Sequence, residues 1–166
     1  MTDKTLENQF IDVFQKNIGI ILKISRAFTK NAHDREDLIN DIANELWKAF
    51  PGFQGQSKVS TWIYRVALNT SMNYKRKYKS KPVFFSDIKE NKNYTLLIEE
   101  NNYEGIEKLY NCINDLNEIN KVIIILYLDG KTHEEIAEIT GISKTNTGTR
   151  ISRIKEQLKE MINSKN

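Results

Sequence analysis

Three carboxylates recur at a spacing of four residues in the N-terminal half of the chain: Asp37, Asp41 and Glu45. Carboxylates can bind the divalent metal of a nuclease, so that activity is one interpretation of the pattern. Spacing of four along a helix sets the side chains in a line, which does not by itself build a compact octahedral site. If the three carboxylates hold no metal, they form either an ordinary solvated helix face or a surface for a basic partner.

A second group of polar side chains lies near the C-terminus, on the outer side of a predicted helix. Thr147, Ile151, Ile154 and Leu158 recur with spacings of four, three and four and form its buried stripe. The outer face is short and polar at its start and basic farther along, which suits base edges in the major groove and then phosphate. The candidates for reading bases are Lys144, Thr145, Asn146 and Thr149, and those for phosphate are Arg150 and Arg153.

The residues just before this helix predict a helix-turn-helix. Thr132 and Glu135 have the spacing of a capping box, in which each side chain accepts a hydrogen bond from an exposed backbone N–H. Gly141 supplies the left-handed residue for a sharp turn, and Ser143 caps the next helix. A generic helical hairpin has the same spacing; the basic outer face favours DNA binding.

Other reactive residue types are isolated. His33 and His133 each lie beside a predicted helix start, without a nucleophile or metal ligand at suitable spacing, so neither is expected to be catalytic. Cys112 is the only cysteine, which excludes an internal disulfide and a cysteine-rich zinc site. We expect no enzyme activity, no metal and no cofactor.

Composition and periodicity predict an all-α protein of two small helical domains. The 166 residues are 39% hydrophobic, and apolar residues recur every three or four positions with few strand signals. A first helix is expected over residues 10–31, a second one capped by Asp34 and stopped at Pro51, and a third from Trp62 into a basic run. The second cluster comprises helices over 106–113, 119–128, 133–140 and 144–161.

The domain boundaries follow from where the periodicity fades. We expect an N-terminal domain over 1–79, a flexible linker over 80–107, and a C-terminal helix-turn-helix domain over 108–166. The net charge is only +3, but residues 65–81 carry six bases and no acid, so phosphate would be attracted locally. The apolar stretch over 18–24 contains Lys23 and is too short to span a bilayer, which predicts a cytoplasmic protein without stable membrane insertion.

Three sequence motifs follow one another along the chain. The two N-terminal motifs are Asp37-Leu-Ile-Asn-Asp41-Ile with Glu45, and Thr61-Trp-Ile-Tyr-Arg-Val-Ala67 with Asn69 and Asn73. The C-terminal motif comprises Leu116 to Lys121, Leu126 to Gly130, Glu135-Ile-Ala137, Gly141-Ile-Ser143 and Thr149-Arg-Ile-Ser-Arg153. In this order they cover nearly the whole chain. The first two resemble regions 2.2 and 2.3–2.4, and the third resembles region 4, of the sigma-70 family of RNA polymerase sigma factors, in particular of its extracytoplasmic-function (ECF) group.

The resemblance implies a factor that binds core RNA polymerase, directs it to promoters and initiates DNA opening. Its partners would be the clamp helices and flap of the large polymerase subunits, promoter DNA and, as in many members, an anti-sigma factor. The residues implied for clamp binding are Asp37, Leu38, Asp41, Ile42 and Glu45. Those implied at the -10 element are Trp62, Arg65, Asn69, Asn73, Lys75, Arg76 and Lys77, with the two asparagines as base contacts. The recognition helix would read the -35 element.

Besides the nuclease considered above, one other interpretation and three departures from the family pattern remain. A stand-alone helix-turn-helix regulator, such as a response-regulator effector, shares the C-terminal pattern but would carry a receiver domain or dimer helix upstream. Asn117, Thr147 and Gly148 replace the proline, aliphatic residue and lysine usual in the family, which affects the promoter sequence recognised rather than the role. Glycine inside a helix costs about 1 kcal/mol relative to alanine; Gly148 either permits close approach to DNA or is a tolerated defect.

Overall fold

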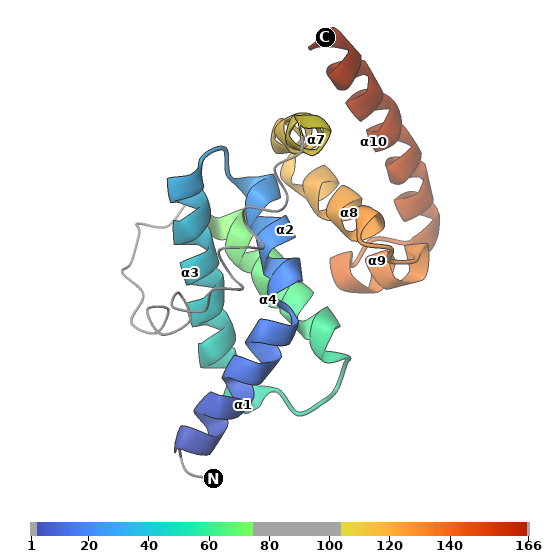
Figure 1. Ribbon diagram of the computed structural model, residues 1–166. Coiled ribbons are helices and arrows are strands. Elements are labelled where there is room, and N and C mark those ends of the chain that lie inside the picture. Colours follow the sequence, from blue (N-terminus) through green and yellow to red (C-terminus); the bar gives the residue numbers. More distant parts are fainter. Residues whose placement is uncertain (1–2, 75–103, 166) are drawn as a thin grey trace.

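The computed structural model describes residues 3–74 and 104–165, and within these ranges the chain forms helices and turns without a strand (Figure 1). The all-α prediction is confirmed. No helix within the described ranges is long and apolar enough to cross a membrane. The elements are α1 (Asp3–Lys16), α2 (Ile18–Phe28), α3 (Ala32–Ala49), a 3-10 turn (Phe50–Gly52), α4 (Val59–Asn73), α7 (Glu104–Asn114), α8 (Glu118–Leu128), α9 (His133–Thr140) and α10 (Lys144–Ser164).

The single helix expected over residues 10–31 is wrong, because the chain breaks at Asn17 into α1 and α2. Asn17 leaves helical geometry at φ −116° and ψ 12°. Its side-chain amide donates to the backbone oxygen of Val13 over 2.8 Å. Asparagine often forms such local bonds, which compete with the helical ladder. The apolar periodicity continues through the break, so the sequence pattern alone reads as one helix.

The cap of α3 also differs from the expected one. Asn31, and not Asp34, is the N-cap: its Oδ1 accepts from the backbone N–H of Asp34 over 2.8 Å. Asp34 instead lies in the first turn, where a negative charge is favoured by the helix dipole. The predicted stop at Pro51 is confirmed by the 3-10 turn that ends α3. Helices α2, α3 and α4 then pack against one another to form the N-terminal domain.

The helix-turn-helix forms as its local signals predict. The backbone N–H of Glu135 donates to Thr132 Oγ1 over 3.1 Å, and the N–H of Thr132 donates to Glu135 Oε2 over 2.8 Å. Gly141 is left-handed at φ +78°, and Ser143 Oγ accepts from the N–H of Asn146 over 3.1 Å. Helix α10 packs on α7, α8 and α9 to complete the C-terminal domain.

The two domains lie against each other (Figure 1). Helix α2 contacts α7 and α8, and α4 contacts α9. The predicted linker is too long at its C-terminal end, because α7 begins at Glu104; the rest of the linker, residues 80–103, lies outside the described residues. The packing of α2 and α4 on the C-terminal domain determines which surfaces are open to a partner.

Candidate nucleic-acid interface

The buried stripe of α10 fixes which side of this helix faces solvent. Ile151, Ile154 and Leu158 are buried, and Thr147 is buried with its hydroxyl donating to the backbone oxygen of Ser143 over 2.9 Å. Threonine can stand at this apolar position because its hydroxyl finds a partner within the helix. Helix α10 lies at the outer edge of the molecule in Figure 1, and five of the six DNA-reading residues predicted on it are exposed.

Two of the predicted recognition residues are held by neighbouring helices. Lys144 Nζ lies 2.7 Å from Glu134 Oε1 on α9, and Arg150 Nη1 donates to Asn120 Oδ1 on α8 over 3.3 Å. The hydrogen bond and charge of Lys144 lower the pKa of Glu134 below its ordinary value. Four other candidates are exposed on the outer face: Thr145, Asn146, Thr149 and Arg153. Asn120 was not singled out from the sequence, since no local pattern predicts a contact across thirty positions.

Gly148 faces another part of the protein. A side chain built at this position would place its Cβ 3.3 Å from Nδ1 and 3.4 Å from Cε1 of His133, at the start of α9. The glycine therefore makes room for the imidazole of His133 between the two helices of the helix-turn-helix. The contact with His133 explains the glycine at position 148 without any role in DNA binding.

On α4 the predicted residues fall into two groups. The ring of Trp62 stacks on Phe53 with centroids 4.9 Å apart, so it packs with the protein's own aromatic residues. Asn69 and Asn73 are exposed, and Arg65 is half-buried. Arg65 and Asn69 line a cleft of about 200 Å³ whose other wall comes from α8 and α9. Lys75, Arg76 and Lys77 lie outside the described residues.

The acidic row on α3 forms, but not all residues expected to bind the polymerase are accessible. Asp37, Asp41 and Glu45 are half-buried at the surface of the helix. Leu38 and Ile42 are fully buried, so in this conformation they hold α3 in the bundle and cannot touch a partner. Within the described ranges, no group of three or more histidine, cysteine or acidic side chains is arranged to hold a metal ion.

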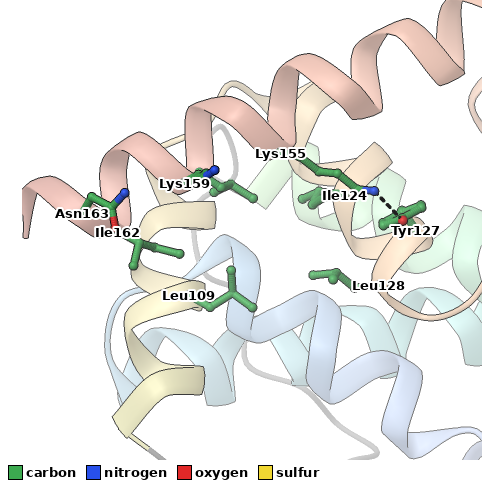
Figure 2. A pocket seen from close by; sticks show the side chains of 9 residues that line it. Leu109, Ile124, Tyr127, Leu128, Lys155, Lys159, Ile162 and Asn163 are labelled. Carbon is green, nitrogen blue, oxygen red and sulfur yellow. Dashed lines mark hydrogen bonds between the residues drawn. The ribbon is translucent and has the colours of Figure 1, made fainter.

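An apolar groove on the C-terminal domain was not predicted (Figure 2). It has a volume of about 300 Å³ and runs between α7, α8 and α10. Leu128 at its edge is 52% exposed, and two lysines, Lys155 and Lys159, border it. Lys155 Nζ donates to Tyr127 Oη over 2.6 Å and also lies 4.3 Å from the centroid of that ring. The available signal was Leu128 itself, an apolar residue directly before a polar turn.

Comparison with known sequences matches both domains to one family. The family described as "Sigma-70 region 2" matches residues 13–81, and "Sigma-70, region 4" matches residues 106–158. The ECF RNA polymerase sigma-E factor of Haemophilus influenzae is 27% identical over 96% of this chain and 89% of that protein. The sigma-E factor of Escherichia coli K12 is 28% identical over 75% of this chain and 72% of that protein.

Comparison with solved structures supports the same fold. The structure of CnrH in complex with the cytosolic domain of CnrY matches with a TM-score of 0.63, at 16% identity, and the match covers 100% of both chains. The acidic helix α3 and the helix that carries the Trp62 motif, α4, lie within the matched region 2. The capped helix-turn-helix lies in the part of the chain that matches region 4. The chain belongs to the sigma-70 family, as an ECF-type sigma factor that directs RNA polymerase to promoters.

Proposed function

We propose that this sigma factor divides its work between three surfaces, each on a different helix. The acidic row of α3 docks on the clamp helices of core polymerase, α4 grips and opens the -10 element, and α10 reads the -35 element. The observation that carries the proposal is the outer face of α10, where Thr145, Asn146, Thr149 and Arg153 are exposed above a buried stripe. A helix with that face fits the major groove.

On α3, the proposed docking residues are Asp37, Asp41 and Glu45. Opposite charge on the clamp helices would orient the encounter and speed it. Leu38 and Ile42 contribute by holding α3 rigid, because their side chains are in the core. A rigid helix presents the three carboxylates without a further cost in ordering them.

On α4, Asn69 and Asn73 are the proposed base contacts and Arg65 the proposed phosphate contact. Both asparagines are exposed, which supports their proposed role as base contacts. Trp62 is proposed to act indirectly, because its stacking on Phe53 orients the start of α4. Opening DNA without ATP requires holding unstacked bases, and each base stacked on an aromatic ring is worth about 1 to 3 kcal/mol.

The groove between α7, α8 and α10 is the proposed site for the polymerase flap. Its apolar floor and the flanking lysines fit an amphipathic helix with an acidic border. An anti-sigma factor is a second proposed partner: CnrH, which shares the fold, was solved in complex with a cytosolic domain of another protein. The chain itself is proposed to have no active site and to act in the cytoplasm, with bond formation left to the polymerase.

Two substitutions on different surfaces test this division. Asp41→Arg should weaken binding to core polymerase, and Arg150→Ala should weaken binding to an upstream promoter fragment while leaving core binding intact. Native co-purification with core and fluorescence anisotropy with a labelled promoter fragment measure the two losses. A stand-alone DNA-binding regulator predicts instead that the chain never associates with core. Equal loss of both activities in both variants would contradict separate surfaces.

A further inference from the structure

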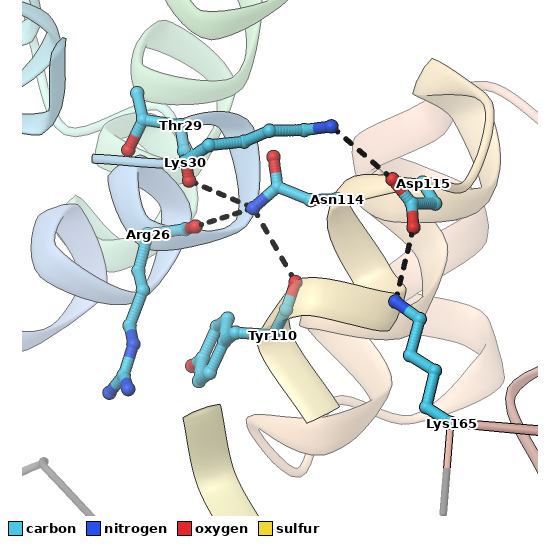
Figure 3. Close-up of polar contacts among 7 residues, drawn as sticks. All are labelled: Arg26, Thr29, Lys30, Tyr110, Asn114, Asp115 and Lys165. Carbon is cyan, nitrogen blue, oxygen red and sulfur yellow. Dashed lines mark hydrogen bonds and ion pairs between the residues drawn. The ribbon is translucent and has the colours of Figure 1, made fainter. Parts of the chain in front are cut away.

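Helix α10 is tied to the rest of its domain at both ends by a lysine and a carboxylate. At its C-terminal end, Lys165 Nζ lies 3.3 Å from Oδ2 of Asp115, in the turn between α7 and α8 (Figure 3). At its start, Lys144 Nζ lies 2.7 Å from Glu134 Oε1 on α9. Of these two pairs, the second contains a residue predicted to read bases. It is therefore the pair that bears on the choice of promoter sequence.

The pair at the start of α10 joins the first turns of two helices. Ser143 caps α10, so Lys144 is its first residue, and Thr132 caps α9, so Glu134 is its second residue. The helix dipole favours an acid and disfavours a cation in a first turn. The carboxylate of Glu134 therefore lies in a favourable place and offsets the charge of Lys144 in an unfavourable one.

The helix that carries Lys144 supplies no acid to hold it. The positions three and four residues farther along, where a neighbour on the same face would lie, are Thr147 and Gly148. The hydroxyl of Thr147 donates to the backbone oxygen of Ser143, and the imidazole of His133 lies beside Gly148. The direction of the Lys144 side chain is thus set from α9.

The contact between Lys144 and Glu134 sets direction more than stability. The two side chains are 63% and 73% exposed, and water screens an ion pair that is so accessible. The hydrogen bond and the charge of Lys144 lower the pKa of Glu134, so its carboxylate is charged at neutral pH. A DNA molecule that approaches the start of α10 therefore meets a lysine whose charge is already matched.

The charge of Glu134 distinguishes this contact from the one that holds Arg150. Arg150 is held by Asn120, whose amide oxygen is neutral and is not repelled by a phosphate. A phosphate that took Lys144 would instead leave the carboxylate of Glu134 unpaired and close to the DNA. An unpaired like charge is a device that selects against one kind of contact. Contact between Lys144 and the DNA backbone is therefore disfavoured.

Contact between Lys144 and a base edge carries no such penalty. A lysine ammonium has three donors, so one can stay on Glu134 while the others bind acceptors of the DNA. The N7 and O6 atoms of guanine are neutral acceptors in the major groove and are common partners of lysine. Thr145, Asn146 and Thr149 follow on the same helix and are exposed, and their short side chains leave room for a base edge. Lys144 can therefore contact a base without leaving Glu134.

We propose that Glu134 determines sequence specificity at the -35 element, because it directs Lys144 to base edges and withholds it from phosphate. Glu134 acts through Lys144 and is therefore a positioning residue. The inference rests on the proposed role of α10 in reading the -35 element. Removing the charge of Glu134 should strengthen binding to every DNA sequence and weaken the discrimination between sequences.

Fluorescence anisotropy with the full chain and two fluorescein-labelled duplexes tests the proposal. The first duplex is the sequence that the wild-type chain selects from a randomised pool, and the second is a scrambled version of it. Glu134→Gln and Lys144→Ala are compared singly and together. The matched control is Glu160→Gln, which makes the same change in charge at an exposed position near the other end of α10. Each dissociation constant is measured at several KCl concentrations, and circular dichroism verifies folding.

The discrimination between the duplexes is the ratio of the dissociation constant for the scrambled duplex to that for the selected one. In Glu134→Gln this ratio should fall about five- to tenfold, which is what one base contact supplies. The slope of log affinity against log salt concentration on the scrambled duplex should steepen by about 0.9, because Lys144 then neutralises one more phosphate. In the Lys144→Ala background, Glu134→Gln should change neither quantity more than Glu160→Gln does.

Two results would overturn the proposal. One is a change in Glu134→Gln no larger than that in Glu160→Gln, and the other is a full change that persists without Lys144. A wild-type chain that selects no sequence from the pool would refute the proposed reading role of α10 itself, and this inference with it. A selected sequence that Glu134→Gln still discriminates as well as wild type would refute the inference alone.

Discussion

The guanidinium of Arg65 on α4 lies 3.6 Å from the carboxylate of Glu138 on α9, and 3.5 Å from the backbone oxygen of the same residue. One arginine therefore stands both in the surface proposed for the -10 element and in the contact between the domains. The two side chains are 41% and 65% exposed, so the pair is screened by water. The role of Arg65 is therefore better tested by its effect on promoter DNA than by its effect on the free energy of unfolding.

Replacing each partner of this pair should give different results. Glu138→Gln should change the free energy of unfolding by less than about 1 kcal/mol, because exposed ion pairs contribute little. Arg65→Ala should weaken promoter opening by about 1.5 to 3 kcal/mol, the worth of a charged hydrogen bond. Urea unfolding measures the first, and permanganate reactivity of unpaired thymines in the polymerase complex measures the second. Normal opening by Arg65→Ala would remove this residue from the DNA site.

The capping box of α9 should make stability depend on pH. The hydrogen bond from the backbone of Thr132, and then the charge of Lys131, lower the pKa of Glu135 below its ordinary value. A lowered pKa stabilises the fold above the ordinary value of 4.5, and this contribution is lost as the pH falls through the lowered one. Glu135→Gln should therefore be less stable than wild type near neutral pH and equal to it in acid.

Urea unfolding midpoints between about pH 7 and about pH 3.5 test the capping box. The matched control is Glu156→Gln, on an exposed position of α10, which should show no such convergence. A constant difference between wild type and Glu135→Gln across the range would mean that the charge of Glu135 does not contribute to the cap.

Gly148→Ala should stabilise the C-terminal domain. Inside a helix, alanine makes the folded state about 1 kcal/mol more stable than glycine does. The new Cβ would lie 3.3 Å from His133, but this histidine is exposed, so its ring can turn toward solvent. The melting temperature should rise, and should rise further in the double variant with His133→Ala. A lower melting temperature that His133→Ala restores would show that the imidazole cannot move.

The groove can be tested without disturbing the core. Leu128→Asp should weaken binding to core polymerase, because Leu128 is 52% exposed at the groove edge. Its free energy of unfolding should change by no more than about 0.5 kcal/mol, as for other surface substitutions. Leu158→Asp, at a buried position of the same groove, should instead unfold the domain. Unchanged core binding by Leu128→Asp would exclude this groove as a flap site.

The helix-turn-helix could be predicted from the sequence because its signals are local. Thr132 and Glu135, Gly141 and Ser143 each act within three or four residues, and each takes the predicted role. The same holds for the buried stripe of α10, whose period is that of the helix itself. Where a bond forms between near neighbours, residue type and spacing determine it.

The rest depended on contacts that spacing does not encode. Asn17 ends α1 through a hydrogen bond to Val13, although the apolar pattern continues past it. Asn31 and Asp34 are both residue types that cap helices, and Asn31 takes the N-cap position. Asn114 and Lys121 read as ordinary polar positions, yet both lie between the domains. The motif match also led to the assignment of Leu38 and Ile42 as binding residues, whereas their apolar character at helical spacing already indicated the core.

The central claim is that two separate helices read two promoter elements, and mapping transcript 5′ ends tests it most directly. Core polymerase reconstituted with the chain transcribes fragmented genomic DNA, and the starts are compared with those of core alone. The account predicts starts that share two upstream elements, with Asn69→Ala relaxing preference only in the nearer element and Arg150→Ala only in the farther one. Starts identical to those of core alone, or both substitutions acting on the same element, would contradict it.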